Sequence, residues 1–134
     1  MKLSSKTITA IKLFVDLGEH YQKSTVSLID VSKRKDVSKK FLEQIVPLFK
    51  ANDLLVVSRG NQGGYALKKA PSQITLKDII YATENSFEKI NSGFIPLDDV
   101  LDDFDEKIDQ YLSSITLDQL IDKQIGTYSN DYSI

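Results

Sequence analysis

Val-Ser-Arg-Gly-Asn-Gln-Gly-Gly-Tyr-Ala-Leu, residues 57–67, is the stretch from which the fold of this chain can be predicted. Two short apolar runs, 54–57 and 65–67, flank a segment that holds Arg59 and three glycines. Because glycine adopts positive φ at little cost, this pattern is typical of a β-hairpin. We therefore predict a hairpin whose tip, residues 58–64, is polar and basic.

Two short amphipathic segments precede the hairpin. Ser27, followed three residues later by Asp30, resembles a capping box and predicts a helix over about 28–34. A turn over 35–37 leads to Ser38, which is expected to cap a second helix with apolar residues at helical spacing: Phe41, Leu42, Ile45, Leu48 and Phe49. Two short helices joined by a tight turn indicate a helix-turn-helix, so the hairpin would be the wing of a winged-helix domain.

In such a domain the second helix, here residues 38–51, enters the major groove of DNA, and we expect the wing to lie beside it. Lysine donates to guanine, glutamine pairs with adenine, and an arginine reaches the minor groove or the flanking backbone. The alternative for the two lysines of the helix is a solvated face. The candidate DNA contacts are Ser4, Lys6, Ser27, Ser38, Lys39, Lys40, Gln44, Arg59, Gly60, Asn61 and Gln62.

The first segment predicts a helix with one buried face, formed by Ile8, Ile11 and Val15 and ending near Gly18. Its opening turn, residues 4–7, is rich in hydroxyls, which either cap the helix or meet a phosphate. A later helix, capped by Thr75 and running to residue 84, should close the core against the first helix. Residues 1–84 would thus form the DNA-binding domain.

The C-terminal part predicts a long amphipathic helix with an apolar stripe from Leu97 to Ile115, followed by a short helix that starts at a capping box of Thr116 and Gln119. Residues 85–96 lack periodicity and are interpreted as a linker, 97–126 as a helical region ended by Gly126, and 127–134 as a tail. The apolar stripe of the helix must bury itself against something, and a second subunit is favoured over packing back on its own domain. Its predicted dimerisation residues are Leu97, Val100, Leu101, Phe104, Ile108, Tyr111 and Leu112.

Charge divides the chain in two. Residues 1–70 carry 13 Lys and Arg against 6 Asp and Glu, and residues 71–134 carry 4 against 13. The first half is the electrostatic footprint of a polyanion binder, and the second would be repelled by the same polyanion. The acidic run on the long helix lacks the spacing of a calcium loop and is interpreted as a solvated face.

Several classes of chemistry are disfavoured by composition. The sequence has no cysteine and one histidine, His20, so we predict no metal site and no cofactor, and interpret His20 as an ordinary loop histidine. The glycine-rich tip does not match a nucleotide-binding loop, and no nucleophile lies beside a base, which makes an enzyme the weakest hypothesis. With neither a spanning apolar run nor a signal peptide, the chain is expected to be soluble and cytoplasmic.

The sequence resembles the Rrf-two family of bacterial winged-helix repressors. The resemblance rests on residues 3–6 (Leu-Ser-Ser-Lys), 26–28 (Val-Ser-Leu), 38–45 (Ser-Lys-Lys-Phe-Leu-Glu-Gln-Ile), 58–60 (Ser-Arg-Gly), 63–67 (Gly-Gly-Tyr-Ala-Leu) and 74–80 (Ile-Thr-Leu-Lys-Asp-Ile-Ile). It implies a mainly helical fold with a small β-hairpin, a winged helix-turn-helix domain, and a homodimer held by the long C-terminal helix on an operator with dyad symmetry.

One departure from the family concerns cysteine. Cluster-binding members carry cysteines between the wing domain and the long helix, a region that corresponds to about 86–96 here, and this chain has none. It is therefore similar to a cluster-free branch, such as the cysteine-metabolism repressors, that senses a metabolite or a partner enzyme, with the tail as a candidate contact. The leading hypothesis is a dimeric, sequence-specific DNA-binding repressor. The alternative is a winged-helix protein-interaction module that acts through its acidic arm.

Overall fold

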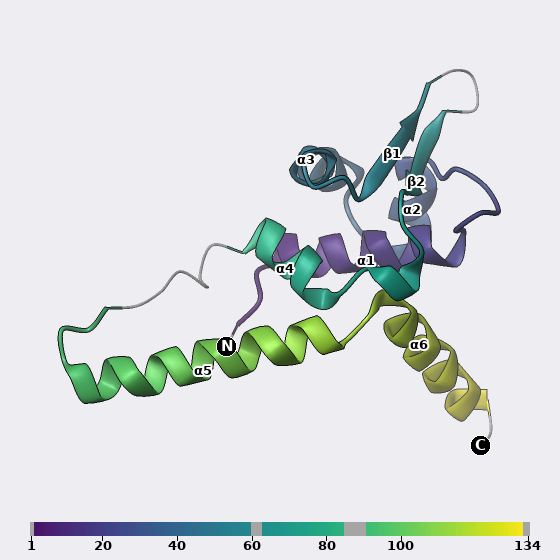
Figure 1. The fold of residues 1–134 in the computed structure, drawn as a ribbon. Helices are drawn as coiled ribbons and strands as arrows, with labels where there is room; N and C mark the ends of the chain where they lie inside the picture. Colours follow the sequence, from purple (N-terminus) through teal and green to yellow (C-terminus); the bar gives the residue numbers. More distant parts are fainter. Residues whose placement is uncertain (1, 60–62, 85–90, 133–134) are drawn as a thin grey trace.

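The computed structural model describes residues 2–59, 63–84 and 91–132, with 126–132 described as backbone only. It confirms the predicted fold class, a mainly helical chain with one small hairpin (Figure 1). The elements are α1 (Ser5–Glu19), α2 (Leu28–Lys35), α3 (Lys39–Lys50), β1 (Leu55–Ser58), β2 (Gly64–Leu67), the 3-10 turn η1 (Pro71–Gln73), α4 (Leu76–Thr83), α5 (Ile95–Ser114) and α6 (Leu117–Tyr132).

Helix α1 lies at the centre of the domain. Its core face consists of Ala10, Leu13, Phe14 and Leu17, all at most 1% exposed. Elements pack on several sides of this helix, so its buried surface is wider than one stripe and includes polar positions. The predicted face was partly wrong, because Ile8 is 45% exposed.

The two predicted caps of the helix-turn-helix are confirmed. Ser27 Oγ accepts the backbone N–H of Asp30, and Ser38 Oγ accepts that of Phe41, each at 3.2 Å. Asp36 adopts the left-handed conformation at φ 53° between the two helices, which an aspartate tolerates better than most residues. Helices α2 and α3 therefore begin within a residue of the expected positions.

The wing is an antiparallel pair in which Leu55 faces Leu67 and Ser58 faces Gly64. A third strand segment adds a single bridge, because Val26 and Tyr65 exchange two backbone hydrogen bonds of 2.9 and 2.7 Å. A Cβ built on Gly64 would lie 2.7 Å from the carbonyl oxygen of Val26. Glycine at this position therefore allows the wing to lie directly against the strand that leads into α2.

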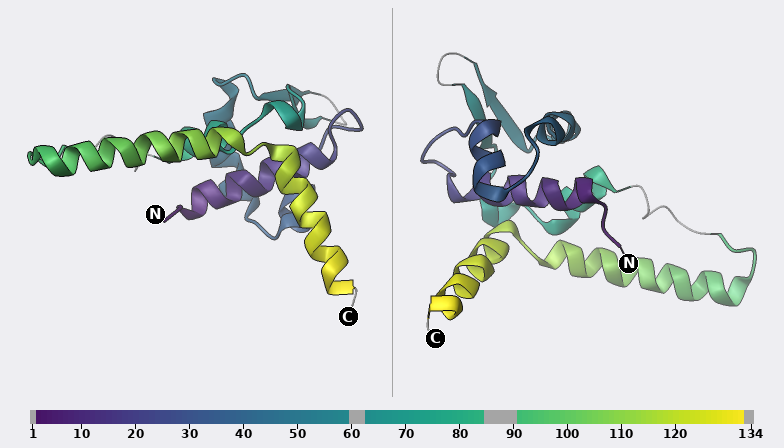
Figure 2. Two further views of the ribbon diagram at one scale, coloured as in Figure 1. Left: turned by 60° about the horizontal axis from the view of Figure 1, so that its bottom comes forward. Right: turned by 180° about the vertical axis from the view of Figure 1, so that it is seen from behind.

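Helix α4 closes the core against α1, as predicted, and its capping box between Thr75 and Asp78 is complete. The α5–α6 junction pairs with the strand before α4: Leu76 N–H donates to Ile115 at 2.9 Å, and Leu117 N–H donates to Ile74 at 2.8 Å. Helix α5 passes beneath α4, and its N-terminal end projects beyond the domain in all three views (Figures 1 and 2).

The C-terminal elements differ from prediction at both ends. Helix α5 begins at Ile95, because proline is tolerated in a first helical turn and Pro96 occupies one. Helix α6 continues through Gly126 to Tyr132, so the predicted stop at Gly126 and much of the predicted tail were wrong. Glycine costs a helix interior only about 1 kcal/mol and does not by itself end a helix.

Helix α6 packs on its own domain. Leu117 is fully buried, and a Cβ on Gly18 would approach Ile121 Cδ1 to 2.7 Å. Gly18 lies inside the last turn of α1, where it permits this close helix contact, and Glu19 is the last helical residue. The predicted dimerisation region therefore divides into a projecting α5 and an α6 that packs on α1 and η1.

Candidate nucleic-acid interface

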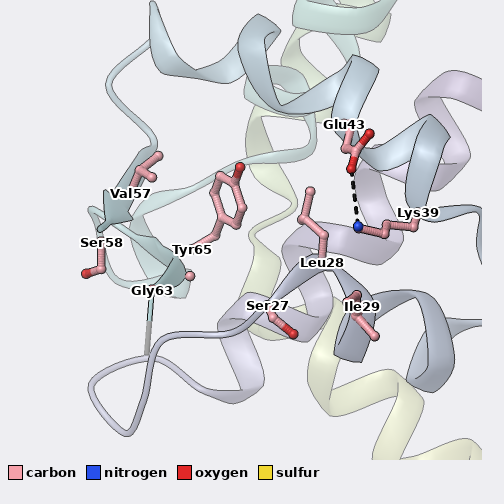
Figure 3. Close-up of a pocket in the computed structure, with 10 residues that line it drawn as sticks. Ser27, Leu28, Ile29, Lys39, Glu43, Val57, Ser58, Gly63 and Tyr65 are labelled. Carbon is pink, nitrogen blue, oxygen red and sulfur yellow. Dashed lines mark ion pairs between the residues drawn. The ribbon is translucent and has the colours of Figure 1, made fainter. Parts of the chain in front are cut away.

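The wing, the start of α2 and the start of α3 enclose one pocket of about 330 Å³ (Figure 3). Tyr65 and Leu28 lie between the wing strand and the first turns of α3 in the close-up. The lining of the pocket combines four apolar or aromatic side chains with two serine hydroxyls and one ion pair. The lining residues are Ser27, Leu28, Ile29, Lys39, Glu43, Val57, Ser58, Gly63, Gly64 and Tyr65.

Two predicted contact residues, Ser27 and Lys39, line this pocket. The Ser27 hydroxyl caps α2, and the same side chain also lines the pocket (Figure 3). Lys39 Nζ lies 3.5 Å from Glu43 Oε1, and about half of each side chain is exposed. An ion pair this exposed is worth little, so the lysine can exchange the carboxylate for a phosphate at small cost.

The other predicted residues of α3 and the wing lie outside the pocket lining. Ser38, Lys40 and Gln44 are exposed on α3, and Arg59 is exposed directly after β1. These side chains are accessible to a large partner such as a duplex. The predicted wing-tip residues Gly60, Asn61 and Gln62 lie outside the described residues.

Ser4 and Lys6 belong to a different part of the surface, at the start of α1. Ser4 caps α1 by accepting the Thr7 N–H at 3.2 Å. The carboxylate of Glu84 accepts the Ser4 N–H at 3.1 Å and the Thr7 hydroxyl at 3.0 Å. The capping alternative therefore describes Ser4, and a negative charge already occupies this helix N-terminus, which disfavours a phosphate there.

Sequence reasoning missed the apolar part of the pocket. Ile29 and Val57 are 47% and 40% exposed, although both side chains are fully apolar. Burial does not alternate along β1, because Val56 is also 43% exposed, so no sequence signal indicated that Val57 lies on the surface. Exposed aliphatic groups beside a lysine suit the sugar and thymine methyl surfaces of DNA.

Helix α2 is fixed to α1 by buried charge. Arg34 binds Asp16 through two hydrogen bonds of 2.9 Å, and the Asp16 side chain is 1% exposed. These hydrogen bonds raise the pKa of the Arg34 guanidinium. Lys35 donates to Glu19 at 2.6 Å and to Gln124 of α6 at 3.3 Å. Helix α2, which packs on α3, is therefore fixed to both α1 and α6.

The predicted dimerisation stripe divides in the structure. Leu112 is 7% exposed and packs within its own chain, as the alternative expected, while Leu101 and Ile108 are half-buried. The remaining members are open to solvent, at 43% to 65% exposure: Leu97, Val100, Phe104 and Tyr111.

Metal binding and membrane insertion can both be judged for residues 2–59, 63–84 and 91–132. No cluster of three or more histidine or acidic side chains in that part of the chain could hold a metal ion. Within the same residues, every helix is too short or too polar to cross a membrane.

Known proteins with similar sequence and structure are transcription regulators. The HTH-type transcriptional regulator IscR of Photorhabdus laumondii is 33% identical over 133 residues, which span 92% of this chain and 81% of that protein. IscR of T. potens matches in structure with a TM-score of 0.79 at 30% identity, over 92% of this chain and 88% of the other. CymR (YrzC), the global cysteine regulator of B. subtilis, has a TM-score of 0.81 at 24% identity over 92% and 98%, and shows the fold alone.

A family model described as Rrf2, iron-dependent transcriptional regulator, matches residues 3–123. The predicted resemblance is thereby confirmed, and it is a resemblance to regulators rather than to enzymes. The 134 residues contain no cysteine, so none can bind an iron–sulfur cluster through a thiolate. The chain belongs to the Rrf2 (Rrf-two) family of DNA-binding transcriptional regulators.

Proposed function

We propose that this chain is a homodimeric, sequence-specific repressor that binds an operator with dyad symmetry. The observation that carries the proposal is the convergence of the α2 start, the α3 start and the wing on one exposed surface of the basic half of the chain. An α-helix fits the width of a major groove, and a hairpin beside it can contact the neighbouring DNA backbone. The cytoplasm is the expected location of such a regulator.

Helix α3 is the proposed reading element. Lys39, Lys40 and Gln44 lie on its exposed side, and Leu42, Ile45 and Phe49 anchor the opposite side at 0% exposure. The lysines and the glutamine have the donors that guanine and adenine edges require. The wing, with Arg59 and the tip residues, would follow the adjacent backbone or minor groove.

The exposed stripe of α5 is the proposed dimer interface. Phe104, Val100 and Tyr111 expose more than half of their area on a helix that projects from the domain. Such an apolar face is normally covered in a stable protein. Pairing of two α5 helices would place two recognition helices on one duplex, as a palindromic operator requires.

The release signal differs from that of the cluster-binding relatives, because no cysteine is available to ligate iron. We therefore expect an effector metabolite or a partner enzyme as the signal. The predicted tail, residues 127–134, is the candidate contact for such a partner.

Fluorescence anisotropy with DNA sites recovered by selection from random sequence tests the function. Each phosphate contact should contribute about 0.9 to the slope of log K against log salt. Affinity that is independent of salt, or no binding at low salt, would refute the proposal.

Arg59→Ala tests the wing. We expect specific binding to weaken by roughly 1 to 3 kcal/mol if the arginine reads a groove. Lys50→Ala is the matched control, since it removes one exposed positive charge from the far end of α3. Equal effects of the two substitutions would show that Arg59 contributes charge only.

A further inference from the structure

Helix α5 is joined to the DNA-binding domain along α4. The backbone pairing of Ile115 with Leu76 fixes the end of α5, and the contacts of α5 to the domain lie mainly on α4. Toward its start the helix projects away from the domain (Figures 1 and 2). The buried Leu112 packs close to this pairing, so a further, directional attachment toward the start of α5 adds control over the direction in which the helix points.

Three side chains supply that attachment, six residues before the backbone pairing. Lys77 Nζ lies 2.8 Å from Asp109 Oδ1 and 5.6 Å from the centre of the Tyr81 ring. Asp109 and Tyr81 also interact electrostatically. Lys77 and Tyr81 are four residues apart on α4, so both face the same side of that helix.

The electrostatics of the three groups agree with this arrangement. The hydrogen bond from Lys77 lowers the pKa of Asp109, and the same contact raises the pKa of Lys77. Partial burial, followed by the charge of Asp109, raises the pKa of Tyr81. Each group is thus in the protonation state that favours the contact at neutral pH.

Because α5 is long, a small change in its angle to the domain moves its N-terminal end a long way. Its 20 residues extend about 30 Å at 1.5 Å per residue. A tilt of about 10° at Ile115 would move the start of the helix by about 5 Å, which exceeds the rise of one base pair, about 3.4 Å.

We propose that Lys77, Tyr81 and Asp109 form a clamp that fixes the angle between α5 and the DNA-binding domain and so sets the half-site spacing of the operator. The inference rests on the proposed function, because it requires dimerisation through α5. The three are positioning residues, since their role is to orient the two recognition helices rather than to touch DNA.

Lys77→Met removes the ammonium and keeps most of the side-chain length, and Tyr81→Phe removes only the hydroxyl. The chain offers a matched control in Lys107, which pairs with Asp103 one turn away on α5 itself and does not bridge α5 to α4. Lys107→Met therefore breaks an exposed lysine–aspartate pair of the same kind without releasing the clamp.

The first measurement is the distance between spin labels on Lys12→Cys of α1 and Asp99→Cys of α5, both exposed positions in a chain without native cysteine. Doubly labelled chain is diluted into excess unlabelled chain, so that only distances within one subunit contribute. We expect one narrow distribution for the wild type and for Lys107→Met, and a broadened one for Lys77→Met. A distribution as narrow as that of the wild type would overturn the clamp.

The second measurement compares affinity for the selected operator with affinity for versions one base pair longer or shorter between half-sites. Lys77→Met should reduce the discrimination by about two- to fivefold, the range of an exposed ion pair, and Lys107→Met should not. Undiminished discrimination with a broadened distance distribution would overturn the spacing role. A wild type that binds no DNA would remove the proposed function and the spacing role together, while the distances still decide the clamp.

Discussion

Gly64→Ala tests whether the wing must lie directly against the strand before α2. The new Cβ would lie 2.7 Å from the Val26 oxygen, 2.9 Å from its carbonyl carbon and 3.0 Å from its nitrogen. All three are backbone atoms, which cannot rotate away as a side chain can. The wing or the Val26 strand must therefore move.

The cost follows from what that movement breaks. Val26 and Tyr65 exchange two backbone hydrogen bonds, of 2.9 and 2.7 Å, immediately beside Gly64. At about 1 kcal/mol net for each bond, separation of the strands should destabilise the chain by about 2 kcal/mol. For a chain of 134 residues this corresponds to a decrease in Tm of about 7 °C. The pocket between wing and α2 would open as well, so operator affinity should also decrease.

Thermal unfolding at fixed protein concentration and operator anisotropy measure both effects. Gly18→Ala is the matched control, because its Cβ would meet Ile121 Cδ1, also at 2.7 Å, which is the end of a flexible side chain. Alanine also favours the helix by up to about 1 kcal/mol, so we expect little net change at Gly18. A Gly64→Ala variant with wild-type Tm and wild-type operator affinity would refute the reasoning.

Arg34→Met leaves the carboxylate of Asp16, 1% exposed, without its partner, and urea unfolding should show a loss of about 2 kcal/mol, partly recovered by Arg34→Lys. Phe104→Glu, at a side chain 53% exposed, should leave the fold intact and convert dimer to monomer in sedimentation; a persistent dimer would place the interface elsewhere. Because the pKa of Asp109 is lowered, its stabilising contribution to the ion pair is fully present above its usual pKa and is lost only as the pH decreases below that value. Because the pKa of Lys77 is raised, its contribution is fully present below its usual pKa and is lost only as the pH increases above that value. The spin-label distances should therefore be constant from about pH 5 to 9, and a change inside that range would contradict this.

The local parts of the fold were predictable because their causes are local. Ser27, Ser38 and Thr75 each cap the helix that the sequence pattern assigned to them. Such a cap depends on a side chain and a backbone N–H only three residues apart, so the necessary information lies in one short window. The hairpin was equally evident, since its glycines and flanking apolar runs are contiguous.

Long-range contacts explain what the sequence did not show. The exposure of Ile8 depends on which elements surround α1, and no window of α1 contains that information. The same holds for a second role of Gly18, which lies one residue before the end of α1, as predicted, and also permits the approach of Ile121 from a helix a hundred residues later. Periodicity identifies a helix better than it identifies the side on which a central helix is covered.

The candidate interface was predictable by residue type and less so by position. Charged and hydroxyl residues that suit DNA were identifiable from chemistry alone, and Lys39 and Ser27 do line the pocket. Ile29 and Val57 were missed because an aliphatic side chain in sequence is normally assigned to the core, and only their exposure makes them surface residues.

The contacts hold the wing and α2 more firmly to the rest of the domain than they hold α5. Hydrogen bonds from Val26 hold the wing to the strand that enters α2, and the pair of Arg34 with the buried Asp16 holds α2 to α1. Wing and recognition helix should therefore move as one body. The ion pair between α4 and α5 is more exposed, with Lys77 at 39% and Asp109 at 40%. A release signal is then expected to act on the spacing of two intact reading surfaces rather than to distort either one. The expectation is specific, because an effector acting in this way weakens binding to a full operator and leaves binding to a single half-site unchanged. An effector that weakened both equally would refute it.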